Sequence, residues 1–334
     1  MFLYLLLSTF TSTILTVEAT CNILSSSSAC LLPFPDDFWR IPSNGNIKAH
    51  VNLDNTSLPI DGQGGQIDPN SGGYNSLSGF STLGPILASI PGVDLTASSL
   101  PRLWDISSSS NVLTSSSILY DAVSKTVLEH WVELDESSDG PTPYEKALLA
   151  WPASRLFDST RHIVAFRNLV DVNGIPITRS DGFDALVRNI PTNNPAIEAA
   201  RPRFNSIFTE LEALGWPREN LTLAWDFTTM STDDVTSVFI SMRDDALQRI
   251  ANGVRFEITS IDNTPAANTS RRIHGQFYVP CYLNYNAIPA LDSHLILDVQ
   301  GKPVYQNDVA FDFEVVVPLS VAANGVPVPV LQYG

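Results

Sequence analysis

Positive charge is scarce in this chain. Lys and Arg together number 19 against 35 Asp and Glu, which gives a formal net charge of -16 over 334 residues, and there is no run of basic residues. Proteins that bind nucleic acids need clustered basic side chains to neutralise phosphates. The composition therefore excludes nucleic acid as a partner.

The motifs of the common hydrolases are also missing. No G-x-S-x-G nucleophile elbow occurs, and none of the five histidines stands in an H-E-x-x-H pair. His162 and His274 lie in apolar strand patterns and are interpreted as hydrogen-bonded structural residues, whereas His50 and His130 are interpreted as surface or loop residues. His294 follows an Asp-Ser dipeptide, but neighbours on a strand point to opposite faces and do not form a triad.

Carboxylates are abundant, but they do not single out a site. The acids considered for glycoside hydrolysis are Glu133 with Asp135, Asp226, and Asp233 with Asp234. Among 35 acids such pairs arise by chance, so solvated surface charge is the interpretation we favour. The stretch from Asp61 to Asp68 offers oxygens to calcium but does not match the twelve-residue helix-loop-helix pattern. No glycine-rich phosphate loop is present, and we expect no catalytic, cofactor-binding or metal-binding residues.

The first nineteen residues predict an export signal. Met1 to Thr16 is an uncharged apolar run, shorter than the ~20 residues that cross a bilayer. Small residues at Val17 and Ala19 fit a cleavage site after Ala19, so residues 1–19 read as a signal peptide and the mature protein as secreted. An uncleaved membrane anchor stays open as the alternative. Three sequons agree with an extracellular glycoprotein and begin at Asn55, Asn220 and Asn268.

Cysteines are few and odd in number. Cys21, Cys30 and Cys281 remain after cleavage, and in an oxidising compartment we expect one disulfide and one thiol. A Cys30–Cys281 pair would tie the N-terminal segment to a late strand, whereas a Cys21–Cys30 pair would close a small surface loop. Both pairings stay open, and Cys30 with Cys281 is the candidate disulfide. The spacing fits neither a zinc site nor a redox dithiol.

The distribution of residue types predicts a mainly β fold with inserted helices. Residues 20–99 are rich in Ser, Pro and Gly and predict an irregular segment packed on a core. Residues 100–260 predict a β-sandwich and residues 261–334 a further β-rich segment. The expected strands are 112–120, 126–133, 148–151, 162–166, 175–178, 254–261, 275–282, 295–299, 309–317 and 326–333.

Two amphipathic helices are expected within the sandwich, near residues 195–215 and 232–251. Asn194-Pro195 begins the first and Gly215 closes it, with apolar residues recurring every three or four positions. Ser231 is a plausible cap for the second, whose apolar stripe includes Val235, Phe239 and Leu247. We expect this stripe to face the core rather than a cofactor.

Several segments resemble the N-terminal region of secreted bacterial lipase- or esterase-like α/β-hydrolases, known from virulence-factor lipases. The resemblance is carried by CLLPFPDDF (30–38), YNSLSGFSTLGP (74–85), LAWDFTT (223–229) and GQFYVPCYL (275–283). The strand-turn unit around Ile163–Leu169 and Asp171–Gly174 resembles a bacterial immunoglobulin-like domain. Each motif is short, but together they span most of residues 30–334.

The resemblance implies a chain without its catalytic part. In that family a strand ending in Tyr-Gly runs into His-Gly-Leu-x-Gly, and this chain stops at Tyr333-Gly334. It therefore implies the non-catalytic region of a carboxylic ester hydrolase, with an absent C-terminal α/β-hydrolase domain and a lipid or ester surface as partners. The alternative function is a stand-alone secreted acidic binding module. Relatives often place a cysteine within residues 311–318, which leaves Cys281 without its expected partner.

Overall fold

The computed structural model describes residues 21–25, 30–45, 48–58, 60, 62–70, 73–137, 146–264, 267–284 and 293–333. The predicted signal peptide lies outside these residues. The chain divides into two compact units, Met1–Ser231 (unit 1) and Thr232–Gly334 (unit 2). The sequence predicts a sandwich that includes residues up to 260. The division instead places the second long helix, Thr232–Arg249, in unit 2.

Unit 1 contains two main antiparallel sheets. A three-stranded sheet has the order β3-β7-β6 and a four-stranded sheet the order β5-β4-β8-β9. The strands are β3 (Ile86–Ala88), β4 (Ser117–Asp121), β5 (Thr126–Leu128), β6 (His130–Leu134), β7 (Leu148–Pro152), β8 (Arg161–Arg167) and β9 (Leu221–Thr228). A small hairpin joins β1 (Arg40–Ile41) to β2 (His50–Val51). The mainly β fold with inserted helices is the one that the sequence predicts.

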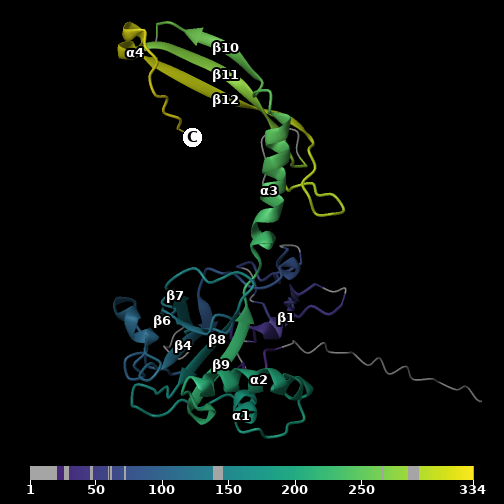
Figure 1. Cartoon of the computed structure of the whole chain (residues 1–334), viewed down its shortest axis with the longest axis vertical. Coiled ribbons are helices and arrows are strands. Elements are labelled where there is room, and N and C mark those ends of the chain that lie inside the picture. The colour runs from purple at the N-terminus through teal and green to yellow at the C-terminus, as the bar shows by residue number, and fades with distance from the viewer. Residues whose placement is uncertain are drawn as a thin grey trace, which may run out of the picture. The chain divides into compact units, whose positions relative to one another are not determined.

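The four-stranded sheet is covered on both faces, and its strands β4, β8 and β9 are buried along nearly their whole length. On one face, Ser117 of β4 contacts His130 of β6, so this face meets the three-stranded sheet. On the other face, Asp226 of β9 contacts Arg203 of the long helix α2 (Pro195–Ala213). Figure 1 shows α2 running beside β9. Unit 1 is thus layered, with one shared apolar core.

The helix α2 follows the predicted signals closely. Asn194 caps it by accepting from the backbone N–H of Ala196 (2.9 Å), Pro195 occupies its first turn, and Gly215 follows it with a φ of 79°. Four of its large apolar residues are fully buried: Phe204, Ile207, Phe208 and Leu211. A shorter helix that the sequence analysis missed, α1 (Asp181–Val187), precedes it and is capped by Ser180.

The irregular N-terminal segment is held by a buried group of charges. Asp36 accepts from Arg203, which also contacts Asp226 at 2.5 Å, and Arg161 contacts the second oxygen of Asp226 at 2.5 Å. Asp37 accepts from the backbone and hydroxyl of Thr228 on β9. Because burial alone is unfavourable to charge, these partners are what keep the group in place.

Unit 2 is built around one antiparallel sheet of order β10-β11-β12. Its elements are the helix α3 (Thr232–Arg249), β10 (Phe256–Asp262), β11 (Thr269–Cys281), β12 (Asn307–Pro318) and the short helix α4 (Leu319–Asn324). The three strands lie side by side, with α4 at one end of the sheet (Figure 1). A bulge between Ile258 and Ser260 shifts the register of β10 by one residue.

Several strand predictions are wrong in detail. The predicted strand 126–133 is two strands, β5 and β6, and most of the predicted 112–120 segment precedes β4 as turn and loop. Residues 175–178, 295–299 and 326–333 form no strand and only isolated bridges at most, whereas β9 was not predicted as a strand at all. Proline at positions 176, 303, 327 and 329 interrupts ladder donation near these segments, which explains the loss.

The disulfide joins Cys21 to Cys30. The candidate pair Cys30–Cys281 is therefore wrong, and the alternative that closes a small loop is the one that forms. Cys281 lies at the end of β11 in unit 2, outside this disulfide.

Candidate functional site

The acids and histidines singled out in the sequence do not meet in one place. Glu133 accepts from the indole N–H of Trp151 at 2.7 Å, and Asp233 lies exposed in the first turn of α3. Asp226 lies in the buried charge group described above. Within the described ranges no cluster of three or more His, Cys, Asp or Glu side chains is arranged to hold a metal ion. Part of the Asp61–Asp68 stretch, Asp61 itself, lies outside those ranges.

Within the buried charge group, the pKa of the Asp37 carboxyl is shifted upward. Burial, followed by the nearby Asp226, raises the pKa of Asp37, while Thr228 and Arg203 oppose the rise. Burial alone would lower the pKa of Arg203, but Asp36 and Asp226 outweigh it and hold the pKa above its ordinary value. Arg161 and Arg203, together with Arg40 at 3.8 Å from Asp37, balance the three carboxylates, so the arrangement is that of a structural ion-pair network.

A serine–histidine contact lies between the two sheets of unit 1. The Nε2 atom of His130 is 2.8 Å from the Ser117 hydroxyl, and its Nδ1 atom is 3.0 Å from the carbonyl oxygen of Leu128. Because a carbonyl only accepts, Nδ1 carries the proton and Nε2 accepts from Ser117. Both residues are about 1% exposed, and burial lowers the pKa of His130 to about 4. The pair has nucleophile–base spacing but no access for a substrate, and the prediction of His130 as a surface or loop residue is wrong.

His162 also differs from the prediction. It is fully buried in β8 and stacked on Phe227, with ring centroids 5.4 Å apart. Neither ring nitrogen has a hydrogen-bond partner of normal geometry in the described part of the chain. Burial lowers the pKa of His162, against the opposing effects of Asp121 and the Thr160 backbone. The ring is buried as predicted, but its two nitrogens lack the hydrogen bonds that the prediction gave them.

The remaining histidines and the sequon asparagines lie toward the surface. His274 of β11 lies 3.7 Å from Glu314, on the polar face of the unit 2 sheet. His50 and His294 each contact a nearby residue, Lys48 and Asn284. The three sequon asparagines are all exposed, at positions 55, 220 and 268.

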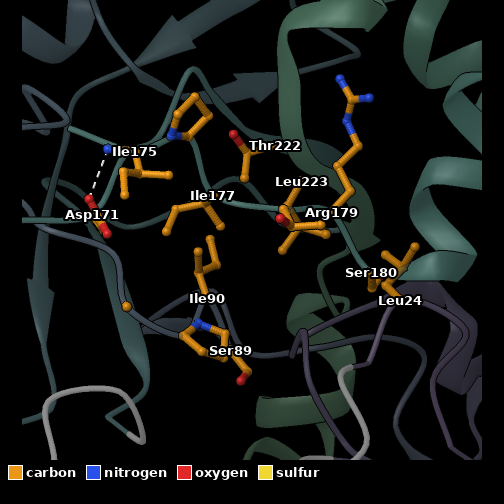
Figure 2. Close-up of a pocket in the computed structure, with 14 residues that line it drawn as sticks. Leu24, Ser89, Ile90, Asp171, Ile175, Ile177, Arg179, Ser180, Thr222 and Leu223 are labelled. Carbon is orange, nitrogen blue, oxygen red and sulfur yellow. Dashed lines mark hydrogen bonds between the residues drawn. The ribbon is translucent and has the colours of Figure 1, made fainter. Parts of the chain in front are cut away.

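Unit 1 contains a pocket of about 400 Å³ near the start of β9 (Figure 2). Four segments far apart in the sequence line it: Leu24 of the N-terminal segment, the loop 89–92 after β3, residues 171 and 175–180 before α1, and the first residues of β9. Figure 2 shows the side chains of Ile90, Ile175 and Ile177 pointing toward one another. Sequence reasoning missed this site, because short-range patterns do not place these segments together.

Backbone and side-chain hydrogen bonds fix the walls of this pocket. Asp171 Oδ1 accepts from the backbone N–H of Ile175 at 2.8 Å, which Figure 2 marks, and this bond lowers the pKa of Asp171. Arg179 donates from Nε to the carbonyl oxygen of Leu221 at 2.6 Å and contacts Asp184 at 3.3 Å. The segment 171–180 is therefore held against the start of β9.

The apolar faces of unit 2 are the second candidate site. In the sheet, one face carries mostly apolar side chains, and we call it the apolar face: Phe256, Ile258, Ile261, Ile273, Phe277, Val279, Val309, Phe311, Phe313 and Val315. Arg271 and Asn307 lie at its two ends. Phe256 is 62% exposed and Phe311 40% exposed. Gly275 makes room on this face, since a Cβ atom there would meet the Phe313 ring at 2.4 Å.

The opposite face of the same sheet is polar. Arg272 of β11 lies 3.2 Å from Glu314 of β12, and Gln276 donates to Asp312 at 2.9 Å. The apolar stripe of α3, predicted to face the core, is largely exposed at Val235, Phe239 and Leu247. Among the described residues of unit 2, Tyr282 and Val309 are the buried hydrophobic side chains. Unit 2 therefore exposes apolar surface that soluble units usually cover.

No described helix of the chain combines the length and apolar character needed to cross a membrane. Comparison of the chain with protein-family models, curated proteins and solved structures gives no match.

Proposed function

We propose that this chain is the non-catalytic region of a secreted lipase- or esterase-like α/β-hydrolase, and that the apolar face of unit 2 docks the catalytic domain. The single observation that carries the proposal is this face, apolar on one side of a sheet whose other side is polar. An antiparallel sheet of this pattern normally packs its apolar side on another layer. A contiguous exposed patch of this kind marks an interaction site.

The pairing register of β10 with β11 keeps apolar side chains on one face of the sheet, which supports the proposal. Ile258 pairs with Gly275 and Ile261 pairs with Ile273, on the same side of the sheet. The two isoleucines are three positions apart, so in a regular strand they would point to opposite faces. The bulge between them adds the residue that returns Ile261 to the apolar face.

The chemistry of the described residues also supports a non-catalytic role. The one serine–histidine contact discussed above is sealed in the core, and the arginine-balanced acids are structural. We expect the purified chain to hydrolyse no short-chain p-nitrophenyl esters. Turnover that persists after purification to homogeneity would contradict a non-catalytic role.

The transcript downstream of the Gly334 codon gives the first test. We expect it to read into His-Gly-Leu-x-Gly and later into a G-x-S-x-G elbow. A stop codon directly after Gly334 would overturn the proposal and favour the alternative, a stand-alone secreted acidic binding module.

The docking role is tested with two neighbouring valines on opposite faces of β12. Val315 lies on the apolar face and is 43% exposed, while Val316 lies on the polar face and is 46% exposed. We expect Val315→Ser to reduce both concentration-dependent self-association and binding of a dye that reports exposed apolar surface. The matched control, Val316→Ser, removes the same atoms and leaves both signals unchanged. Equal effects of the two substitutions would refute a face-specific docking surface.

A further inference from the structure

The pocket of unit 1 has a lining that restricts its ligand. Its apolar wall is aliphatic throughout and consists of Leu24, Ile90, Ile175, Ile177 and Leu223 together with two prolines. No aromatic side chain lines it, so it offers no ring for stacking on a sugar or a nucleobase. Its volume of about 400 Å³ lies within the ~300–1,000 Å³ that small-molecule sites occupy.

One polar group in the lining is buried and has an unused donor. Thr222 is 8% exposed, and its hydroxyl oxygen accepts from the backbone N–H of Leu169 at 3.2 Å. Among the residues that the structure describes, this is the one hydrogen bond that the hydroxyl forms, and in it the hydroxyl accepts. A buried hydroxyl with an unused proton stabilises a ligand oxygen that accepts from it.

We propose that this pocket binds the aliphatic chain of one fatty acid or fatty acyl ester, whose carbonyl or carboxylate oxygen accepts from the Thr222 hydroxyl. The lining also contains Ser89, Asp171, Thr178, Arg179 and Ser180, of which Asp171 and Arg179 form the wall hydrogen bonds described above. An aliphatic wall with a buried hydroxyl at its edge matches a ligand that has a long chain and one oxygen-bearing end. The pocket belongs to unit 1 and the apolar face to unit 2. Its biological meaning rests on the proposed function, whereas the binding is a property of this chain alone.

Titration calorimetry of the whole chain with saturated fatty acids, below their micelle-forming concentrations, tests the binding. We expect one site per chain and an affinity that rises about fourfold for each added methylene, then levels off once the pocket is filled. A parallel titration with methyl decanoate separates an ester ligand from a free acid, because only decanoate carries the charge. No saturable heat with either compound would overturn the proposal.

Two exposed residues of the same loop supply matched variants. Ile175 lines the pocket and is 59% exposed, while Val172 does not line it and is 70% exposed. We expect Ile175→Asn to weaken decanoate binding about tenfold, because it removes an apolar wall, and Val172→Asn to leave it unchanged. Equal weakening by both would show that the pocket is not the site.

The donor is tested at Thr222, with protein made in a host that does not glycosylate, because Thr222 belongs to the Asn220 sequon. We expect Thr222→Val to weaken binding about fivefold and Thr222→Ser to retain it. Tryptophan fluorescence confirms that each variant folds.

A last variant separates this proposal from the proposed function. Phe311→Ser, on the apolar face of unit 2, is expected to leave decanoate binding unchanged. Loss of binding in this variant would move the acyl site to the apolar face and overturn the pocket, while the docking proposal would stand. Failure of the Val315→Ser test would remove the docking proposal and leave the pocket intact.

Discussion

His130 makes the stability of unit 1 depend on pH. Its pKa in the folded protein is about 4, because the ring is buried, whereas a histidine in an unfolded chain has a pKa of about 6.5. Between these values the unfolded chain binds more protons than the folded one, so the free energy of unfolding rises with pH. The contribution is fully present above about pH 6.5 and is lost as pH falls toward about 4.

The magnitude follows from the two pKa values. A shift of about 2.5 units corresponds to about 3 kcal/mol when the loss is complete. Between about pH 7.5 and about pH 5, His130 alone is expected to cost the folded state about 2 kcal/mol. The lowered pKa of His162 acts in the same direction.

Urea unfolding followed by tryptophan fluorescence measures this effect in unit 1. All six tryptophans lie before residue 232, so the signal comes from unit 1 alone. The comparison variant is His130→Gln, which keeps a polar side chain at the site but does not titrate. We expect the loss of stability on going from about pH 7.5 to about pH 5 to be about 2 kcal/mol smaller in the variant. An equal loss in both proteins would refute the reasoning.

Two further substitutions probe buried polar groups by the same unfolding assay. His162→Phe is expected to raise the free energy of unfolding by about 1 kcal/mol, because it removes two ring nitrogens that lack partners; a decrease would show that these nitrogens are satisfied in solution. Arg203→Met is expected to cost about 3 kcal/mol or more, because Asp36 and Asp226 lose a buried partner. Arg188→Met, which breaks an exposed pair with 64% of the arginine side chain accessible, should cost less than about 1 kcal/mol. Similar costs for the two arginines would contradict a buried network.

Local signals in the sequence predicted the helix α2 well. The cap at Asn194, the proline at position 195 and the glycine at 215 all act within a turn of the helix, so their effect does not depend on distant residues. The same method gave α3 the right extent but the wrong surroundings. The periodicity at Val235 and Phe239 specifies one apolar side of a helix, but it does not specify whether another element covers that side.

The candidate sites depended on contacts that local patterns do not contain. His130 was expected near the surface, yet the pairing of β6 with β7 and its contact with Ser117 bury it. The pocket of unit 1 is lined by Ile90, Ile177 and Thr222, which come from three separate segments of the chain. Only the topology of the sheets brings such residues together, and a single sequence carries no direct record of it.

The contacts that hold the N-terminal segment set the order in which unit 1 can be completed during synthesis. The indole of Trp225 donates to the carbonyl oxygen of Pro35 at 2.8 Å, across a separation of 190 residues. Arg203 donates to Asp36 across a separation of 167 residues. At ~5–20 residues per second, about 10 to 40 s pass between the emergence of the two ends of the longer contact. For that interval Pro35 and Asp36 lack these two late partners. A ribosome pause or rare-codon stretch before β9 would lengthen the exposure of this segment, whereas one after β9 would leave unit 1 already able to close.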